Sequence, residues 1–261
     1  MIESITILGG RGRSGLAEPV ERVELKMGEV VTIVGPTGSG KTTLINDIEL
    51  FADGNTPTGR RVLFDGQVAP PVYRDDPSRN PIALITQHTT FLSDLPVGEF
   101  LHAHARIRGG PSVEAEARVE ASLAFANQLT GEPIQPGIRM TELSGGQTRA
   151  LLIADAAIIC DTPIVLLDEV ENAGIHRTRA IELLRQYRKI FIFVTHDPRI
   201  ALLSDYRIVL REGRMTRVLT TNDVERDFSV RVTRLDDALS RLRDRLRLGE
   251  RLEGFELEGV A

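Results

Sequence analysis

The chain has 261 residues, of which 41% are hydrophobic and 26% are charged. This balance is typical of a soluble globular protein that buries a substantial core. The net charge of −5 and the pI near 5.7 argue against a nucleic-acid partner and against binding to an anionic membrane surface.

The sequence contains no apolar run long enough for a transmembrane helix, and its first ten residues lack the features of a signal peptide. The single cysteine, Cys160, excludes an internal disulfide framework and suits a reducing compartment. Its apolar neighbours predict a buried structural thiol. We therefore expect a cytoplasmic protein, either free or peripheral on the cytoplasmic face of the membrane, where another chain would supply the spans.

Strand-like and helix-like patterns alternate along most of the chain. The runs that predict strands are residues 4–8, 20–25, 30–35, 60–66, 81–87, 163–169, 189–197 and a hairpin at 206–219 that turns at Glu212–Gly213. The patterns that predict helices are residues 41–51, 97–128 with a break near 109–111, a stretch after Ser144, 176–187, and the region beyond 221. This alternation predicts an α/β fold with a mainly parallel sheet.

The helix-rich stretch from about residue 88 to 150 interrupts the α/β pattern, and we expect it to form a lobe of its own. The lobe would belong to a domain of residues 1–220, followed by a helical tail of residues 221–261. In that tail Leu235, Leu239, Leu242 and Leu246 are spaced to form one apolar helix face. Docking of this face on its own domain is the expectation, and a second dimer contact is the alternative.

The loop GPTGSGKT, from Gly35 to Thr42, matches the phosphate-binding pattern G-x-x-x-x-G-K-[ST]. Its glycines let backbone N–H groups turn toward phosphate oxygens, and the following helix adds its positive end. We expect Lys41 to reach the β- and γ-phosphates and the Thr42 hydroxyl to bind Mg²⁺. A loop without function is the alternative, which the preceding strand and the following helix disfavour.

The apolar run PIVLLDE would deliver Asp168 to the carboxyl end of a buried strand beside that loop, where it would hold the metal. Glu169 follows directly and is placed to polarise an attacking water. A surface acidic pair is the alternative. Gln87 and His196 each follow another apolar strand, so both are expected at the same crevice.

A second anion-binding helix start is predicted at LSGGQ, residues 143–147. Ser144 is a good helix cap, and Gly145 and Gly146 leave backbone N–H groups uncovered before an apolar-periodic helix. The order of the phosphate loop, Gln87, LSGGQ, Asp168–Glu169 and His196 resembles the ABC ATPase family. The resemblance covers residues 1 to about 220, and LSGGQ is its most specific motif.

The resemblance implies a P-loop NTPase core with a mainly parallel sheet, an antiparallel β subdomain and an inserted α-helical lobe. It also implies an ATPase that binds ATP and Mg²⁺ and forms a head-to-tail, ATP-dependent dimer, so that LSGGQ serves the γ-phosphate bound by a second copy. Glu169, His196 and Gln87 would be catalytic, and Thr42, Gln87 and Asp168 would surround Mg²⁺. The nucleotide-binding residues would be Gly35, Pro36, Thr37, Gly38, Ser39, Gly40, Lys41, Thr42, Thr43, Ser144, Gly145, Gly146 and Gln147.

Three departures from the family pattern stand out. The chain has no aromatic residue or histidine before Phe51 to stack on adenine. Arg11 or Arg13 is a candidate for that role, with a solvated turn as the alternative. Val170 stands where the family usually has a proline after the catalytic glutamate. The segment that follows normally ends in an Asp that crosses the dimer interface, whereas here it runs one residue longer, with His176 near that place.

His102 and His104 are two residues apart on a predicted helix, so their side chains diverge by about 200°. They are not expected to chelate a metal as a pair, and a solvated or partner-facing surface is expected for both. Taken together, the motifs predict the nucleotide-binding subunit of a membrane transporter, with a membrane permease as its partner. The alternative is a soluble ATPase that remodels or loads a cytoplasmic protein or metallocluster assembly.

Overall fold

The computed structural model describes residues 2–108, 112–169 and 177–251. Its strands are β1 Ser4–Leu8, β2 Arg22–Lys26, β3 Val30–Val34, β4 Arg61–Phe64, β5 Gln67–Val68, β6 Ile82–Ile85, β7 Ile164–Asp168, β8 Ile190–Val194, β9 Tyr206–Arg211 and β10 Arg214–Thr220. Its α-helices are α1 Lys41–Glu49, α2 Val72–Asp75, α3 Val97–Ile107, α4 Ser112–Leu129, α5 Gly145–Ala154, α6 Arg177–Leu184, α7 Pro198–Leu203 and α8 Asp223–Arg247. Short 3₁₀ turns occur at Pro77–Arg79 and Met140–Glu142, and a π-helical turn occurs at Asp155–Ile159.

In the described part of the chain, a central sheet of six strands has the order β10-β9-β3-β8-β7-β6. Strands β9, β3, β8, β7 and β6 run parallel, and β10 pairs antiparallel with β9. The predicted α/β fold with a mainly parallel sheet is therefore confirmed. This order brings the carboxyl ends of β3, β8, β7 and β6 together in one row, and ligands of open parallel sheets bind at such an edge.

Both faces of the central sheet are buried, because successive residues of a strand point to opposite sides. In β7, Ile164 and Leu166 pack toward α1 and the antiparallel sheet, whereas Val165 and Leu167 pack toward α3, α4, α5 and α6. The inner strands β3, β7 and β8 are consequently almost entirely apolar, which is why their sequence runs are so easily recognised.

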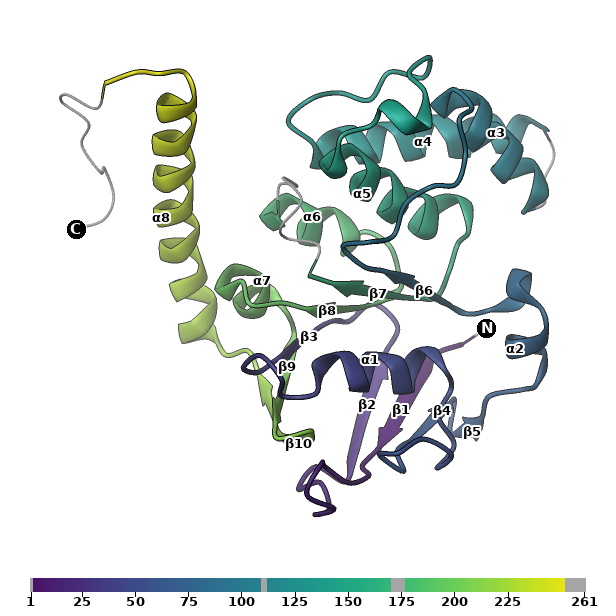
Figure 1. The fold of residues 1–261 in the computed structure, drawn as a ribbon, viewed down its shortest axis with the longest axis vertical. Helices are drawn as coiled ribbons and strands as arrows, with labels where there is room; N and C mark the ends of the chain where they lie inside the picture. The colour runs from purple at the N-terminus through teal and green to yellow at the C-terminus, as the bar shows by residue number, and fades with distance from the viewer. Residues whose placement is uncertain (1, 109–111, 170–176, 252–261) are drawn as a thin grey trace.

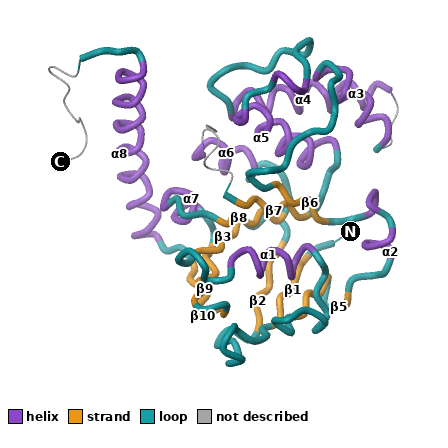
Figure 2. Tube along the Cα trace, viewed as in Figure 1, coloured by secondary structure: helices purple, strands orange, loops and turns teal. Residues whose placement is uncertain are grey.

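Two further parts cover the two faces of this sheet (Figure 1). Within the described residues, a four-stranded antiparallel sheet has the order β2-β1-β4-β5 and lies beyond α1. Helices α3, α4 and α5 form a lobe on the opposite side of the central sheet, and Figure 2 shows the long connection from α4 to α5 running across its outer side. None of the described helices has the length and apolarity needed to cross a membrane.

The C-terminal helix α8 differs from expectation. It packs against α7 at its base and stands beside the rest of the molecule (Figure 1). Of the four leucines predicted to dock on the domain, Leu235, Leu239 and Leu246 are 42%, 37% and 54% exposed. The docking prediction is therefore wrong for these three, although Ala238 on the same helix is fully buried.

Candidate functional site

The phosphate loop links β3 to α1 in a conformation that depends on glycine. Gly38 and Gly40 have φ angles of +76° and +98°, which residues with a Cβ rarely adopt. A Cβ on Gly40 would also lie 2.9 Å from Cα of Gly213 in the β9–β10 turn. Gly40 precedes the first residue of α1 and provides no side-chain cap, so the first N–H groups of that helix are available to an anion held in the loop.

Lys41 is 7% exposed, although lysine is almost never buried without partners. Its Nζ donates hydrogen bonds to the backbone oxygens of Gly35 at 2.9 Å and Pro36 at 3.3 Å. These bonds hold the ammonium group inside the loop, close to where bound phosphate oxygens would lie.

A cavity of about 180 Å³ opens in front of this loop. It brings together the loop and the two strand ends predicted to face it, because β8 lies between β3 and β7. The residues lining the cavity are Arg13, Thr37, Gly38, Gly40, Lys41, Thr42, Thr43, Asp168, Glu169, Val194 and His196. The Thr42 hydroxyl and the Asp168 carboxylate are hard oxygen ligands of the kind that Mg²⁺ prefers.

Glu169 and His196 face each other across this cavity. The distance between His196 Nε2 and Glu169 Oε1 is 3.8 Å, and their side chains are 49% and 36% exposed. Glu169 has a φ of +52°, a left-handed conformation that is strained for a residue other than glycine. Its N–H donates to the backbone oxygen of Val194 at 3.0 Å, which fixes this strained residue against the end of β8.

The LSGGQ segment folds into the predicted capped helix start. The Ser144 Oγ accepts a hydrogen bond from the Gln147 N–H at 3.3 Å, and the Gln147 Oε1 accepts one from the Ser144 N–H at 3.0 Å. This reciprocal pair is a capping box. Gln147 is buried and also donates to the Glu132 backbone oxygen at 3.4 Å, so its side chain is used within its own chain.

A family model described as ABC transporter matches residues 21–172, which is more than half of the chain. The matched region includes the phosphate loop, LSGGQ and the Asp168–Glu169 pair. The chain belongs to the ABC transporter family. It is an ATPase of the ATP-binding cassette type, it binds ATP, and the predicted family and activity are both confirmed.

Two relatives illustrate the extent of the similarity. The chain is 48% identical over 251 residues to an uncharacterised ABC transporter ATP-binding protein of Methanocaldococcus jannaschii, covering 96% of this chain and 95% of that protein. It is 31% identical over 204 residues to a sulfate/thiosulfate import ATP-binding protein of Gloeobacter violaceus, covering 76% of this chain and 56% of that protein.

A solved structure shares the fold. It is a dimeric ATP-binding cassette in a post-hydrolysis state bound to ADP and Pi, and it matches with a TM-score of 0.63 at 23% identity. The match covers 84% of this chain and 99% of that one. The predicted fold class, with its antiparallel subdomain and helical lobe, agrees with this similarity.

Gln87 lies at the end of β6, but the described residues that line the cavity of this cassette do not include it. Its Nε2 lies 3.1 Å from Nε2 of the neighbouring His88. Its backbone oxygen accepts a hydrogen bond from Arg149 Nη2 at 2.5 Å, and Arg149 Nη1 donates to the Gly145 backbone oxygen at 3.0 Å. Arg149 therefore ties the segment at Gln87 to the start of the LSGGQ helix, a link that the motifs did not predict.

Arg13 lines the phosphate cavity and also an adjoining cavity of about 430 Å³. The second cavity continues from the phosphate loop past Ser14, Arg211 and Glu212. Of the two arginines considered for stacking on adenine, both in the described part of the chain, Arg13 lines both cavities and Arg11 lines neither. Arg11 instead forms a bridge with Ala17 through its backbone.

A buried ion network behind this region was not predicted. Arg60 is fully buried and donates to Glu18 at 2.7 Å, to Asp47 at 2.8 Å and to the Gly213 backbone oxygen at 2.9 Å. Burial alone would lower the pKa of Arg60, but its hydrogen bonds and charge interactions with Glu18 and Asp47 outweigh burial and raise it. The network joins the loop of residues 9–21, α1 and the β9–β10 turn. Each of these segments also carries residues that line the cavities, among them Arg13, Lys41 and Glu212.

His102 and His104 contact different partners, as their predicted divergence requires. The predicted surface position is wrong for His104. His102 lies 3.3 Å from Glu116 and is 39% exposed. His104 is half-buried and its Nδ1 lies 2.8 Å from Asp155 Oδ1. The predicted departures at Val170 and His176 lie outside the described residues.

Proposed function

We propose that this chain hydrolyses ATP with Mg²⁺ at the interface of a head-to-tail dimer, in which each site takes its LSGGQ segment from the second copy. One observation carries the proposal. The described residues lining the phosphate cavity come from the N-terminal loop at Arg13, the phosphate loop with the start of α1, and the ends of β7 and β8, and they include none of Ser144–Gln147. A second anion-binding helix start that does not reach its own cavity is what a shared site requires.

Each residue then has a separate task. Lys41 neutralises charge on the β- and γ-phosphates, and the loop N–H groups bind their oxygens. Mg²⁺, when bound, would be held by Thr42 and Asp168 and would offset charge on the same phosphates. The role of Gln87 as a further metal ligand stays a prediction, since Gln87 is not among the described residues that line the cavity. Glu169 accepts a proton from the attacking water, and His196 holds the carboxylate and the γ-phosphate in line.

A mixing experiment tests the shared site. Ser144→Arg places a bulky cation at the γ-phosphate, and Glu169→Gln removes the base, so each variant alone should be inactive. In a mixed dimer, one site takes its phosphate loop and Glu169 from the Ser144→Arg chain and its LSGGQ segment from the Glu169→Gln chain. All parts of that site are intact. We expect partial recovery of ATPase activity in the mixture.

Two controls make this test decisive. Differently tagged copies purified together establish that mixed dimers form and bind ATP. If LSGGQ served the nucleotide of its own chain, every site in the mixture would carry one lesion. Absence of recovery at every mixing ratio, in mixed dimers that bind ATP, would overturn the shared site.

We further propose that the ATPase energises a membrane transporter as its nucleotide-binding subunit. This proposal is supported by the names of relatives that describe transport, such as the sulfate/thiosulfate import ATP-binding protein. Tagged Glu169→Gln chains, held in the ATP state, would be purified separately from membrane and soluble fractions. We expect a multi-span membrane protein at a fixed ratio in the membrane fraction, one that stimulates the wild-type ATPase. Stimulation by a soluble protein complex instead would favour the remodelling or loading role.

A further inference from the structure

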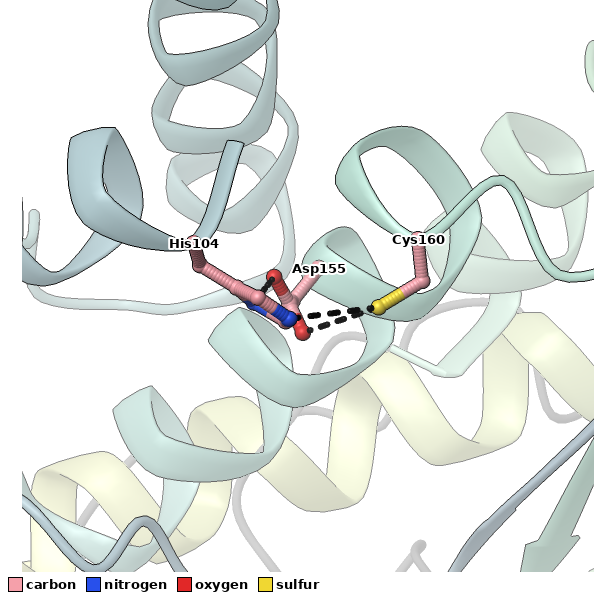
Figure 3. Close-up of side chains that lie close together, drawn as sticks. All are labelled: His104, Asp155 and Cys160. Carbon is pink, nitrogen blue, oxygen red and sulfur yellow. Dashed lines mark hydrogen bonds and ion pairs between the residues drawn. The ribbon is translucent and has the colours of Figure 1, made fainter. Parts of the chain in front are cut away.

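Three side chains with metal-binding atoms meet in the helical lobe, away from the nucleotide cavity. His104 comes from α3, and Asp155 and Cys160 come from the two ends of the π-helical turn that follows α5 (Figure 3). Cys160 Sγ lies 3.9 Å from His104 Nε2 and 3.5 Å from Asp155 Oδ2. The ligand atoms all lie within 4.8 Å of one another.

The π-helical turn creates this meeting. The Cys160 N–H donates to the Asp155 backbone oxygen at 2.8 Å, five residues back. In a regular α-helix, residues five apart point about 140° away from each other. An i→i+5 turn widens the helix so that both side chains reach the same side, and such turns are frequent at functional sites.

The hydrogen bond between His104 and Asp155 prepares the imidazole as a ligand. A carboxylate only accepts, so His104 Nδ1 carries the proton that it donates to Asp155 Oδ1 at 2.8 Å. The lone pair of Nε2 is then directed toward Cys160 Sγ. A carboxylate at the other nitrogen commonly orients a zinc-binding histidine from outside the ligand shell, and Asp155 does this with Oδ1. Its second oxygen, Oδ2, lies beside Cys160 Sγ and is the Asp155 atom available to an ion.

The spacing of the Cys160 sulfur from the other two ligand atoms suits a tetrahedral ion. Zn–S bonds of about 2.3 Å and Zn–N or Zn–O bonds of about 2.1 Å require ligand atoms about 3.5 Å apart. The two sulfur distances of 3.9 Å and 3.5 Å are within a few tenths of this spacing. Thiolate, imidazole and carboxylate together select Zn²⁺ over Mg²⁺ and Ca²⁺, which prefer oxygen ligands alone.

We propose that His104, Asp155 and Cys160 bind one Zn²⁺ ion, with water in the fourth position. The site is neither sealed nor fully open. The His104 and Asp155 side chains are 23% and 11% exposed, and Cys160 is half-buried, so an ion can enter without the lobe unfolding. The ion would join α3 to the end of α5 and so brace the lobe that carries LSGGQ.

Binding requires the thiol to lose its proton. Burial raises the pKa of Cys160 to about 12, and the charge of Asp155 adds to this shift, whereas Arg108 opposes it. Zn²⁺ replaces the thiol proton on sulfur, and one proton is released to solvent. The metal-free form is the neutral thiol donating to Asp155 Oδ2.

Cobalt substitution tests the proposal, because Co²⁺ bound by a thiolate gives an intense sulfur-to-metal absorption band. Cys160 is the only cysteine in the chain, so this band reports on one residue. Nucleotide-free, tag-free protein would be titrated with Co²⁺ and then with Zn²⁺. We expect the band to appear at one Co²⁺ per chain and to disappear as Zn²⁺ displaces it.

Variants then identify the other ligands. Cys160→Ser should abolish the band, and His104→Ala and Asp155→Asn should each weaken metal binding roughly tenfold or more. His102→Ala is the matched control, since His102 lies on the same helix but outside the cluster, and it should bind like the wild type. A folded wild type without the band, or a band unchanged in His104→Ala, would overturn the proposal even if Cys160→Ser failed to fold.

Discussion

At the scale of single residues, Glu169 combines strain with chemistry. Its left-handed backbone costs about 1–3 kcal/mol and is maintained by the bond to Val194, which aims its carboxylate at His196. Glu169→Gln keeps the shape and loses the base. We expect unchanged ATP affinity by calorimetry and turnover reduced by about 100-fold or more. Near wild-type turnover would transfer the role of base to His196.

The chain also lacks an aromatic residue before Phe51, and Arg13 is the side chain placed at the second cavity. A flexible guanidinium group stacks on guanine as readily as on adenine and offers no hydrogen bonds specific to the adenine edge. We therefore expect GTP to compete within about tenfold of ATP, a difference of roughly 1.4 kcal/mol. Competition binding measures this ratio, and a far stronger preference for ATP would mean that another group, such as one on the second copy, recognises adenine.

At the scale of elements, the buried Arg60 network holds the N-terminal loop, α1 and the β9–β10 turn together. Arg60→Met would leave Glu18 and Asp47 buried without their cation, which destabilises a fold by about 3–5 kcal/mol. Denaturant unfolding measures the loss. The neighbouring Arg61→Met is the matched control, because its ion pair with Asp53 is exposed and is worth about 1 kcal/mol or less. Equal losses for both variants would refute the structural role of Arg60.

The elements that the sequence predicts well are those with a local signal. The strand before the phosphate loop and the strand that ends at Asp168 are almost entirely apolar because both faces of the sheet are buried there, and Thr32 is the one polar residue inside them. The glycines of the loop and the cap at Ser144 are equally local, so the positions of Lys41, Asp168 and His196 around one cavity followed from the motifs. The roles of these site residues in binding and catalysis stay predictions.

Features that depend on distant partners were missed. Arg60 meets Asp47, Glu18 and Gly213 across 13, 42 and 153 residues, and no pattern links such positions. The sequence predicts a surface position for His104 because its spacing from His102 is the only local signal, whereas its partner Asp155 lies 51 residues further along. Helix α7 has six residues, too few to show an apolar period.

At the scale of the whole molecule, α8 is the part whose purpose the cassette alone does not explain. An amphipathic helix normally buries its apolar face, since this face supplies most of its stability. Here Leu235, Leu239 and Leu246 remain substantially exposed while α7 holds the base of the helix. The sequence also offers a contact between two copies of the chain as an alternative, and this stays a prediction. Unfolding stability and the mass of the assembly distinguish such a contact from docking of α8 on its own domain.

Leu235→Ser combined with Leu246→Ser changes two of these exposed side chains. Because each already contacts solvent, we expect the free energy of unfolding of the monomer to change by about 1 kcal/mol or less. The control is Leu101→Ala, fully buried in the lobe, which should lose about 2–5 kcal/mol. The two leucine substitutions would also be placed in a chain that carries Glu169→Gln. Light scattering of that chain in the presence of ATP would show whether the mass of the dimer is lost. A loss of monomer stability comparable to that of Leu101→Ala would mean that Leu235 and Leu246 are buried against the domain in solution, which would contradict their exposure in the structure.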